Sequence, residues 1–164
     1  EYNITWFEEP LRPDDIQSYV DLTRNTLIPI AAGEVLTRRQ SFLPWIENHA
    51  VDYLQPDVTK VGGLTEEHRI GQCADDHSIL MVPHGWNTAV GLAADLQLVA
   101  AANNARWVEY ITPGAYIEDL LAEPIKLDGD GMLEISDAPG LGLTFNPDGI
   151  KKHSKGIGLK VKRN

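Results

Sequence analysis

Five ionisable residues stand at matching points of the sequence, each close behind a short run of strand-forming residues. They are Glu8, Glu34, Asp57, His84 and Glu109, and successive members lie 23 to 27 residues apart. A strand with its following helix takes up about this much chain, so one such residue occurs per unit. Residues at the carboxyl ends of parallel strands face the same end of a sheet, where barrel enzymes hold their active sites.

The types of these side chains indicate metal binding and proton transfer. Glu8 and Glu34 offer the hard oxygen ligands that Mg²⁺ prefers, although a stable site needs another carboxylate or a substrate oxygen. The Asp57 carboxylate can orient the His84 imidazole and stabilise its protonated form. Glu109 can share a proton with a substrate oxygen that becomes negative. Together they favour acid–base chemistry on an anionic substrate.

Each of the five residues also has a structural explanation. Glu8 is the first of two adjacent glutamates, which can form a solvated strand exit. Glu34 and Asp57 follow a glycine and a proline, where capping and turn residues are common. A lone histidine such as His84 is often held by hydrogen bonds within a fold. Glu109 is harder to explain, because it stands among aromatic and β-branched residues where an unpaired carboxylate is costly.

The elements that must position these residues alternate along the chain. Strand-like runs cover residues 4–7, 27–32, 51–55, 78–82 and 107–110. Helix-like segments begin after Pro13, Thr37, Gly63 and Thr88; in the third, Leu64, His68, Ile70 and Cys73 recur near helical spacing. This alternation predicts an α/β fold with parallel strands covered by helices. A doubly wound sheet fits too, but the sequence has no GxGxxG or GxxxxGK[ST] phosphate loop.

Composition limits the size and the partners of the chain. Its 164 residues suffice for one domain with a core but not for a complete (β/α)8 barrel, which needs roughly 250 residues. The net charge of −10 argues against a nucleic-acid partner, and no apolar run is long enough to span a membrane. The single Cys73 fits a reducing compartment, so we expect a cytoplasmic protein. Six basic residues within 151–164 predict a solvated basic tail.

The ordered motifs resemble one family. WFEEP, AAGEV, QPDVTKVGG, VPHGWNT and WVEY occur in the order and spacing of the last five barrel strands of the mandelate racemase subgroup of the enolase superfamily. YIEDLLAEPIKLDGDGMLEI and DAPGLGL resemble its C-terminal segment, which returns to a capping domain. The resemblance implies that residues 1–110 form strands four to eight of a partial (β/α)8 barrel. Residues 111–150 would then form the last barrel helix and the return segment to the capping domain, with a short hairpin in it. Residues 151–164 would form the basic tail.

The resemblance also implies roles for single residues. Glu8 and Glu34 match two of three Mg²⁺ ligands. Asp57 and His84 match a dyad that acts as base or acid on one face of the substrate. Glu109 matches the strand-eight acid beside the substrate carboxylate.

Two further positions refine these implied roles. Lys60 matches a lysine common near the sixth strand, with a supporting role in catalysis. Relatives that lactonise muconate or epimerise dipeptides carry a catalytic lysine where Asp57 stands. The sequence therefore resembles the racemase and dehydratase branch, whose members remove the proton α to a carboxylate through an enediolate that Mg²⁺ stabilises. Loss of a β-hydroxyl, helped by His84, would turn an acid sugar into a 2-keto-3-deoxy acid.

Three functions remain open from the sequence. The first is an acid-sugar dehydratase, and the second is a racemase or epimerase of a 2-hydroxy acid. The third is a catalytically inactive fragment that serves as an assembly or binding unit. Intact members carry the remaining Mg²⁺ ligand and a lysine base on strands one to three, which lie outside these 164 residues. We therefore expect the chain alone to bind Mg²⁺ weakly, to turn over little substrate, and to form homo-oligomers.

Overall fold

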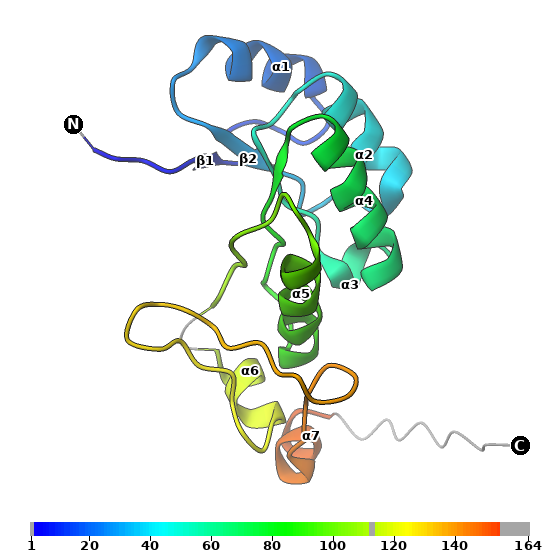
Figure 1. The fold of residues 1–164 in the computed structure, drawn as a ribbon. Coiled ribbons are helices and arrows are strands. Elements are labelled where there is room, and N and C mark those ends of the chain that lie inside the picture. The colour runs from blue at the N-terminus through cyan, green and yellow to red at the C-terminus, as the bar shows by residue number, and fades with distance from the viewer. Residues whose placement is uncertain (1, 112–113, 155–164) are drawn as a thin grey trace, which may run out of the picture.

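Four short parallel strands form one sheet in this computed structural model, which describes residues 2–111 and 114–154 (Figure 1). The strands are β1 (Phe7–Glu8), β2 (Ile30–Ala32), β3 (Tyr53–Leu54) and β4 (Leu80–Met81). They pair in the order β1-β2-β3-β4, so each strand lies beside the one before it in the chain. A doubly wound sheet reverses its strand order part-way. The uninterrupted order of these four strands fits part of a (β/α) barrel.

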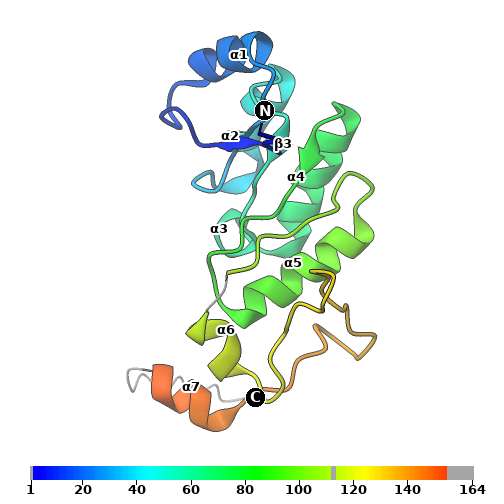
Figure 2. The same cartoon turned by 90° about the vertical axis from the view of Figure 1, so that its left-hand side faces the viewer.

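Helices follow the strands in turn. They are α1 (Ile16–Asn25), α2 (Arg38–Glu47), α3 (Val58–Val61), α4 (Leu64–Asp76) and α5 (Ala89–Ala101), with α6 (Ala115–Leu120) and α7 (Pro147–His153) beyond them. In two perpendicular views α1 lies at one end of the molecule, and α6 and α7 lie together at the other (Figures 1 and 2). The helices between them run along one side of the strands, as the alternation predicts.

The main core lies between the strands and the helices α1, α2 and α4. The rings of Tyr19 and Trp45 are 4.6 Å apart between their centroids, and both side chains are fully buried. Of the residues that recur at helical spacing in α4, Leu64 and His68 are exposed, whereas Ile70 is buried and Cys73 is half-buried. The buried face of α4 instead consists of Glu67, Ile70, Gly71 and Ala74. An acidic residue thus occupies a core position that a hydrophobicity pattern assigns to solvent.

The fifth expected strand, residues 107–110, is not a regular strand in the structure. One parallel bridge joins Met81 to Ala105, and the Glu109 N–H donates to the Pro83 carbonyl at 3.3 Å. Proline has no N–H to continue the ladder. The His84 N–H donates to the Pro56 carbonyl on the other side, and the Gly85 N–H donates to the Glu109 side chain. The segment therefore follows β4 closely enough to position Glu109 without completing a ladder.

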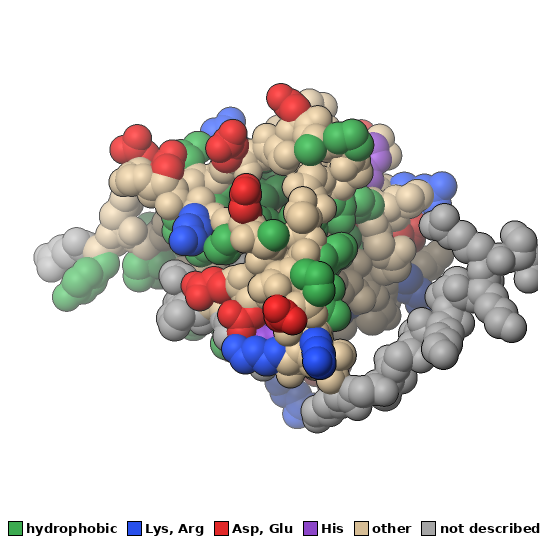
Figure 3. Space-filling model, turned by 90° about the horizontal axis from the view of Figure 1, so that it is seen from below, with side chains coloured by type: hydrophobic (Ala, Val, Ile, Leu, Met, Phe, Trp, Pro, Cys, Tyr) green, Lys and Arg blue, Asp and Glu red, His purple; other side chains and the backbone are tan. Residues whose placement is uncertain are grey.

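The C-terminal part packs against α5. Antiparallel bridges join Leu127 to Leu133, as expected for a short hairpin, and Leu121 to Phe145. Part of the expected basic tail, residues 151–153, belongs to α7, and residues 155–164 lie outside the described residues. Acidic and basic side chains lie close together on the face at the α6–α7 end (Figure 3). Within the described ranges, none of the helices is both long and apolar enough to span a bilayer.

Candidate active site

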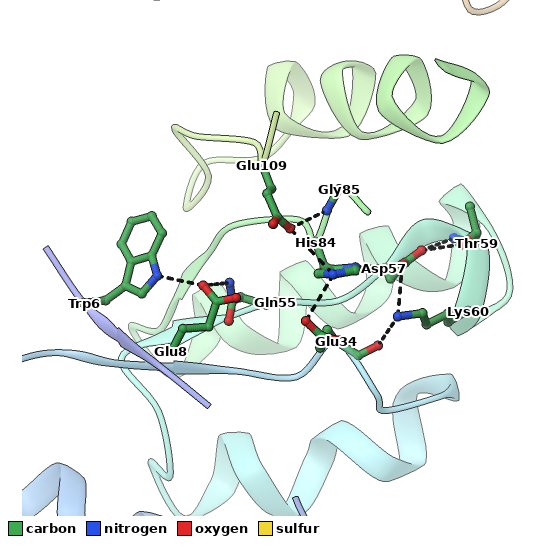
Figure 4. A network of polar contacts seen from close by, with 10 residues as sticks. All are labelled: Trp6, Glu8, Glu34, Gln55, Asp57, Thr59, Lys60, His84, Gly85 and Glu109. Atoms are coloured by element: carbon green, nitrogen blue, oxygen red, sulfur yellow. Dashed lines mark hydrogen bonds and ion pairs between the residues drawn. The ribbon is translucent and has the colours of Figure 1, made fainter. Parts of the chain in front are cut away.

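The five strand-end residues gather on one rim of the sheet (Figure 4). Glu8 ends β1, Glu34 follows β2, Asp57 follows β3 and His84 follows β4. Glu109 comes from the segment beside β4. His84 contacts three of the other four directly, whereas Glu8 is held by a separate pair of donors. The structure thus brings together residues that are up to 101 positions apart in the sequence.

The centre of the site is a buried pair formed by Asp57 and His84. The Nδ1 atom of His84 lies 2.8 Å from Oδ2 of Asp57, and the two residues are 3% and 0% exposed. The other oxygen of Asp57 accepts hydrogen bonds from the backbone N–H and the hydroxyl of Thr59. Asp57 also caps α3, so its position is set by a helix start as well as by its partner. The imidazole is thereby fixed in orientation.

The other ring nitrogen of His84 faces two more carboxylates. Its Nε2 lies 3.1 Å from Oε2 of Glu34 and 3.7 Å from Oε2 of Glu109. Burial alone would lower the pKa of His84. The hydrogen bond to Asp57 and the charges of Glu109 and Glu34 outweigh it and raise this pKa above its usual value. The geometry therefore favours an imidazolium that can donate a proton from Nε2.

Lys60 connects Asp57 to Glu34, which follows the neighbouring strand β2. Its Nζ lies 3.4 Å from Oδ2 of Asp57 and donates to the backbone carbonyl of Glu34 at 3.1 Å. Burial would raise the pKa of Asp57, but the hydrogen bonds from His84 and Thr59, with the charge of Lys60, hold it well below its usual value. Asp57 is therefore ionised across the neutral range. Lys60 contacts only one oxygen of the Asp57 carboxylate, Oδ2.

Gly85 fixes Glu109 and has no room for a side chain. Its N–H donates to Oε2 of Glu109 at 2.8 Å. A Cβ atom at position 85 would lie only 2.2 Å from the carbonyl oxygen of Glu109. The absence of a side chain at Gly85 is therefore what allows Glu109 to approach His84.

Glu8 is held by two donors that converge on one of its oxygens. Trp6 Nε1 and Gln55 Nε2 each donate to Oε2 of Glu8 at 3.0 Å (Figure 4). The sequence gives a weak signal for Gln55: it stands two residues before Asp57, and alternate residues of a strand share a face. Sequence reasoning nevertheless missed it, as it missed Thr59.

Negative charge is crowded around Glu8 and Glu34. Burial and the neighbouring charges of Glu34 and Glu8 raise the pKa of Glu9, and its Oε1 is buried without a hydrogen-bond partner. Glu9 also has a φ of 39°, a conformation that L-residues seldom adopt. The oxygen donors and the unneutralised charge fit a hard cation. However, the described residues contain no group of three or more His, Cys, Asp or Glu side chains arranged to hold a metal.

Two further acids lie buried behind the dyad. Glu67 on α4 and Asp95 on α5 are both 0% exposed, and their four carboxylate oxygens lack hydrogen-bond partners. Burial and the charge of Asp95 raise the pKa of Glu67 to about 9, and burial and the charge of Asp57 raise that of Asp95 to about 8. Both groups are therefore neutral acids near pH 7, unlike Asp57.

Residues 1–149 match the family model described as "Enolase C-terminal domain-like". The chain belongs to this enolase family. It is 34% identical over 158 residues to a D-galactarolactone cycloisomerase of Agrobacterium fabrum, which covers 91% of this chain and 42% of the relative. A D-xylonate dehydratase of Haloferax volcanii is 35% identical over 156 residues, covering 93% of this chain and 37% of the relative.

Solved structures of the enolase family agree with this assignment. A mandelate racemase/muconate lactonizing enzyme from Sulfitobacter sp. matches with a TM-score of 0.86 and 31% identity, over 99% of this chain and 41% of that one. An enolase from Agrobacterium radiobacter bound to Na and L-malate matches with a TM-score of 0.80 and 31% identity, over 90% and 41%. The chain spans about two fifths of the length of the relatives it matches. It is therefore part of a barrel of enolase-superfamily enzymes.

Proposed function

We propose that this chain supplies the acid–base side of a lyase that removes the proton α to the carboxylate of an acid sugar. A base outside these 164 residues, a lysine in the family that the motifs resemble, takes the α-proton and leaves an enediolate. The β-hydroxyl then takes a proton from His84 and leaves as water, and the enol product becomes a 2-keto-3-deoxy acid. The observation that carries the proposal is His84, held by Asp57 at Nδ1 with Nε2 turned towards the carboxylates of Glu34 and Glu109. The dehydratases among the relatives support this substrate class.

In this proposal His84 donates the proton that the departing hydroxyl needs. The proton is on Nε2, which lies near the carboxylates of Glu34 and Glu109. Asp57 holds the other ring nitrogen, Nδ1, and stabilises the imidazolium. Once the proton has left, neutral His84 can accept another from solvent. Glu109, fixed by Gly85, lies where it can share a proton with a substrate carboxylate oxygen.

We further propose that Glu8 and Glu34 contribute two carboxylate ligands to a Mg²⁺ site. Their oxygen donors and the raised pKa of neighbouring Glu9 support a cation at this rim. When bound, Mg²⁺ would supply positive charge that acidifies the α-proton of a substrate carboxylate. Lys60 has a supporting role, because it holds the Glu34 backbone and neutralises part of the Asp57 charge.

A substitution in the full-length protein tests this function. His84→Asn keeps a similar shape but cannot carry protons near neutral pH, so kcat on an acid sugar such as D-xylonate should fall by about 10²–10⁴. The melting temperature should change little. His68→Asn, at an exposed position on α4, is the matched control and should keep full activity.

The form of the product separates the candidate activities. A keto acid that appears with wild type and not with His84→Asn supports the dehydratase. Exchange of the α-proton with solvent deuterium without a keto product would instead identify a racemase or epimerase. Dehydration at the wild-type rate by His84→Asn would make His84 a structural residue.

A further inference from the structure

Glu8 should be poorly fixed by its own strand. It lies at the end of the two-residue strand β1, at the edge of the sheet, and both residues of that strand are exposed. A glutamate in such a place normally samples several rotamers. Here both Trp6 and Gln55 donate to the same carboxylate oxygen, Oε2. One oxygen is thus held from two directions.

Gln55 reaches Glu8 across an intervening strand. The register pairs Glu8 with Ala31 and Ala31 with Tyr53, so these three residues share one face of the sheet. By alternation Gly33 and Gln55 lie on that face one step further on. Small residues at 31 and 33 leave space above β2, and a Cβ on Gly33 would lie only 3.1 Å from the Gln55 backbone nitrogen. The two side chains can therefore meet over β2.

The Gln55 side chain is itself firmly placed. It is 2% exposed, and its Oε1 is buried without a hydrogen-bond partner. Turning the amide over would set that oxygen against the Glu8 carboxylate, so Nε2 must face Glu8. Trp6 is fixed as well, because its ring packs against Tyr53 and Trp107 at 5.3 and 6.3 Å between centroids. Both donors are thus immobilised by parts of the fold other than β1.

We propose that Gln55 and Trp6 are positioning residues that hold Oε2 of Glu8 and leave Oε1 as the single oxygen offered to the cation. The proposal rests on the function proposed above, in which Glu8 is a Mg²⁺ ligand. Mg²⁺ requires nearly ideal octahedral geometry, so a rotating carboxylate would bind it poorly. Loss of residues that orient a metal ligand typically weakens metal binding by about 10–100-fold.

Metal binding tests the proposal without relying on turnover. Mn²⁺ is the probe, and the electron paramagnetic resonance signal of free Mn²⁺ reports its Kd for the full-length protein. Gln55→Met keeps the side-chain length without its N–H, and should raise the Kd by about 10–100-fold. Gln72→Met, at an exposed position on α4, is the control and should leave the Kd unchanged. Glu8→Ala should weaken binding more than Gln55→Met.

The outcomes separate the two proposals. If wild type and Glu8→Ala bind Mn²⁺ equally, or neither binds it, Glu8 is no metal ligand and the proposed metal site fails. If Glu8→Ala loses Mn²⁺ and folded Gln55→Met keeps wild-type affinity, the positioning role is overturned.

A second measurement needs neither metal nor a folded Gln55 variant. The indole N–H signal of Trp6 in nuclear magnetic resonance, assigned with Trp6→Phe, should move in Glu8→Ala. A Trp6 signal unchanged by Glu8→Ala would show that the hydrogen bond is absent and overturn the proposal.

Discussion

Acidic side chains of similar chemistry have opposite ionisation states within this small region. Asp57 accepts hydrogen bonds from His84 and Thr59, and its pKa lies below the usual range. Burial raises the pKa values of Glu67 and Asp95 to about 9 and about 8, because nothing opposes it at Glu67 and only Asn87 opposes it at Asp95. Burial raises the pKa of all three acids, and only at Asp57 do hydrogen-bond donors and the charge of Lys60 outweigh it. At neutral pH, Asp57 remains the ionised partner of His84.

The raised pKa of Glu67 predicts a pH dependence of stability. In the unfolded chain Glu67 ionises near its ordinary pKa of 4.5, whereas the folded protein keeps the proton up to about pH 9. Its stabilising effect is complete below pH 4.5 and is lost as the pH rises towards 9. Each such group contributes up to about 1.4 kcal/mol per pH unit. Wild type should therefore melt several degrees lower at pH 8 than at pH 5.

Glu67→Gln isolates this effect. Glutamine cannot ionise, so thermal melts of this variant should show a shallower fall between pH 5 and 8. Glu47→Gln, at an exposed position on α2, should keep the wild-type slope. Parallel slopes for Glu67→Gln and wild type would mean that Glu67 is already ionised in the folded state.

Among the secondary-structure elements, the segment after β4 controls the geometry of the site. Gly85 donates its N–H to Glu109 and leaves no space for a Cβ. Gly85→Ala should push the 107–110 segment away and cost about 1–3 kcal/mol, as overpacking typically does. The melting temperature should fall by about 2–4 °C per kcal/mol. Differential scanning calorimetry measures both quantities. Gly129→Ala, with open space around it, should change neither, and equal melting of the two variants would refute the steric argument.

The strand-end residues could be predicted from the sequence because a repeated spacing places them on one rim. The contact between Asp57 and His84 follows directly from the pairing of the neighbouring strands β3 and β4. The contact of Gln55 with Glu8 depends on the small residues of the strand between them, which no local pattern reveals. The burial of Glu67 could not be predicted either, because an acid on a helix normally faces solvent. The 107–110 segment has the composition of a strand, but Pro83 has no N–H to donate to it, so a regular hydrogen-bonded ladder does not form.

At the scale of the whole molecule, the inner face of the partial barrel is open. Trp6, Tyr53 and Trp107 pack against one another with tilted rings on this face. Trp107 is 46% exposed, and Phe7 on the edge strand is 53% exposed. Exposed apolar area and a free strand edge favour association. We therefore predict that the 164-residue chain on its own self-associates, as measured by sedimentation velocity.

Substitution of one aromatic residue tests which surface associates. Trp107→Ser should shift the sedimentation profile towards monomer, because it removes apolar area from the open face. Leu27→Ser, at a fully exposed position in the segment between α1 and β2, is the control and should leave the profile unchanged. A wild-type chain that sediments as a monomer and unfolds cooperatively would contradict the prediction.

The order β1-β2-β3-β4 also has a consequence for the ribosome-bound chain. Among the four described strands, each of β2, β3 and β4 pairs with the strand synthesised just before it and does not wait for a distant partner. The sheet can grow in the order of translation, one strand and helix at a time. Asp57 can bond Thr59 as α3 forms, well before His84 emerges. The histidine would then meet a partner whose rotamer is already fixed, so the acid–base pair forms late, on a preassembled rim.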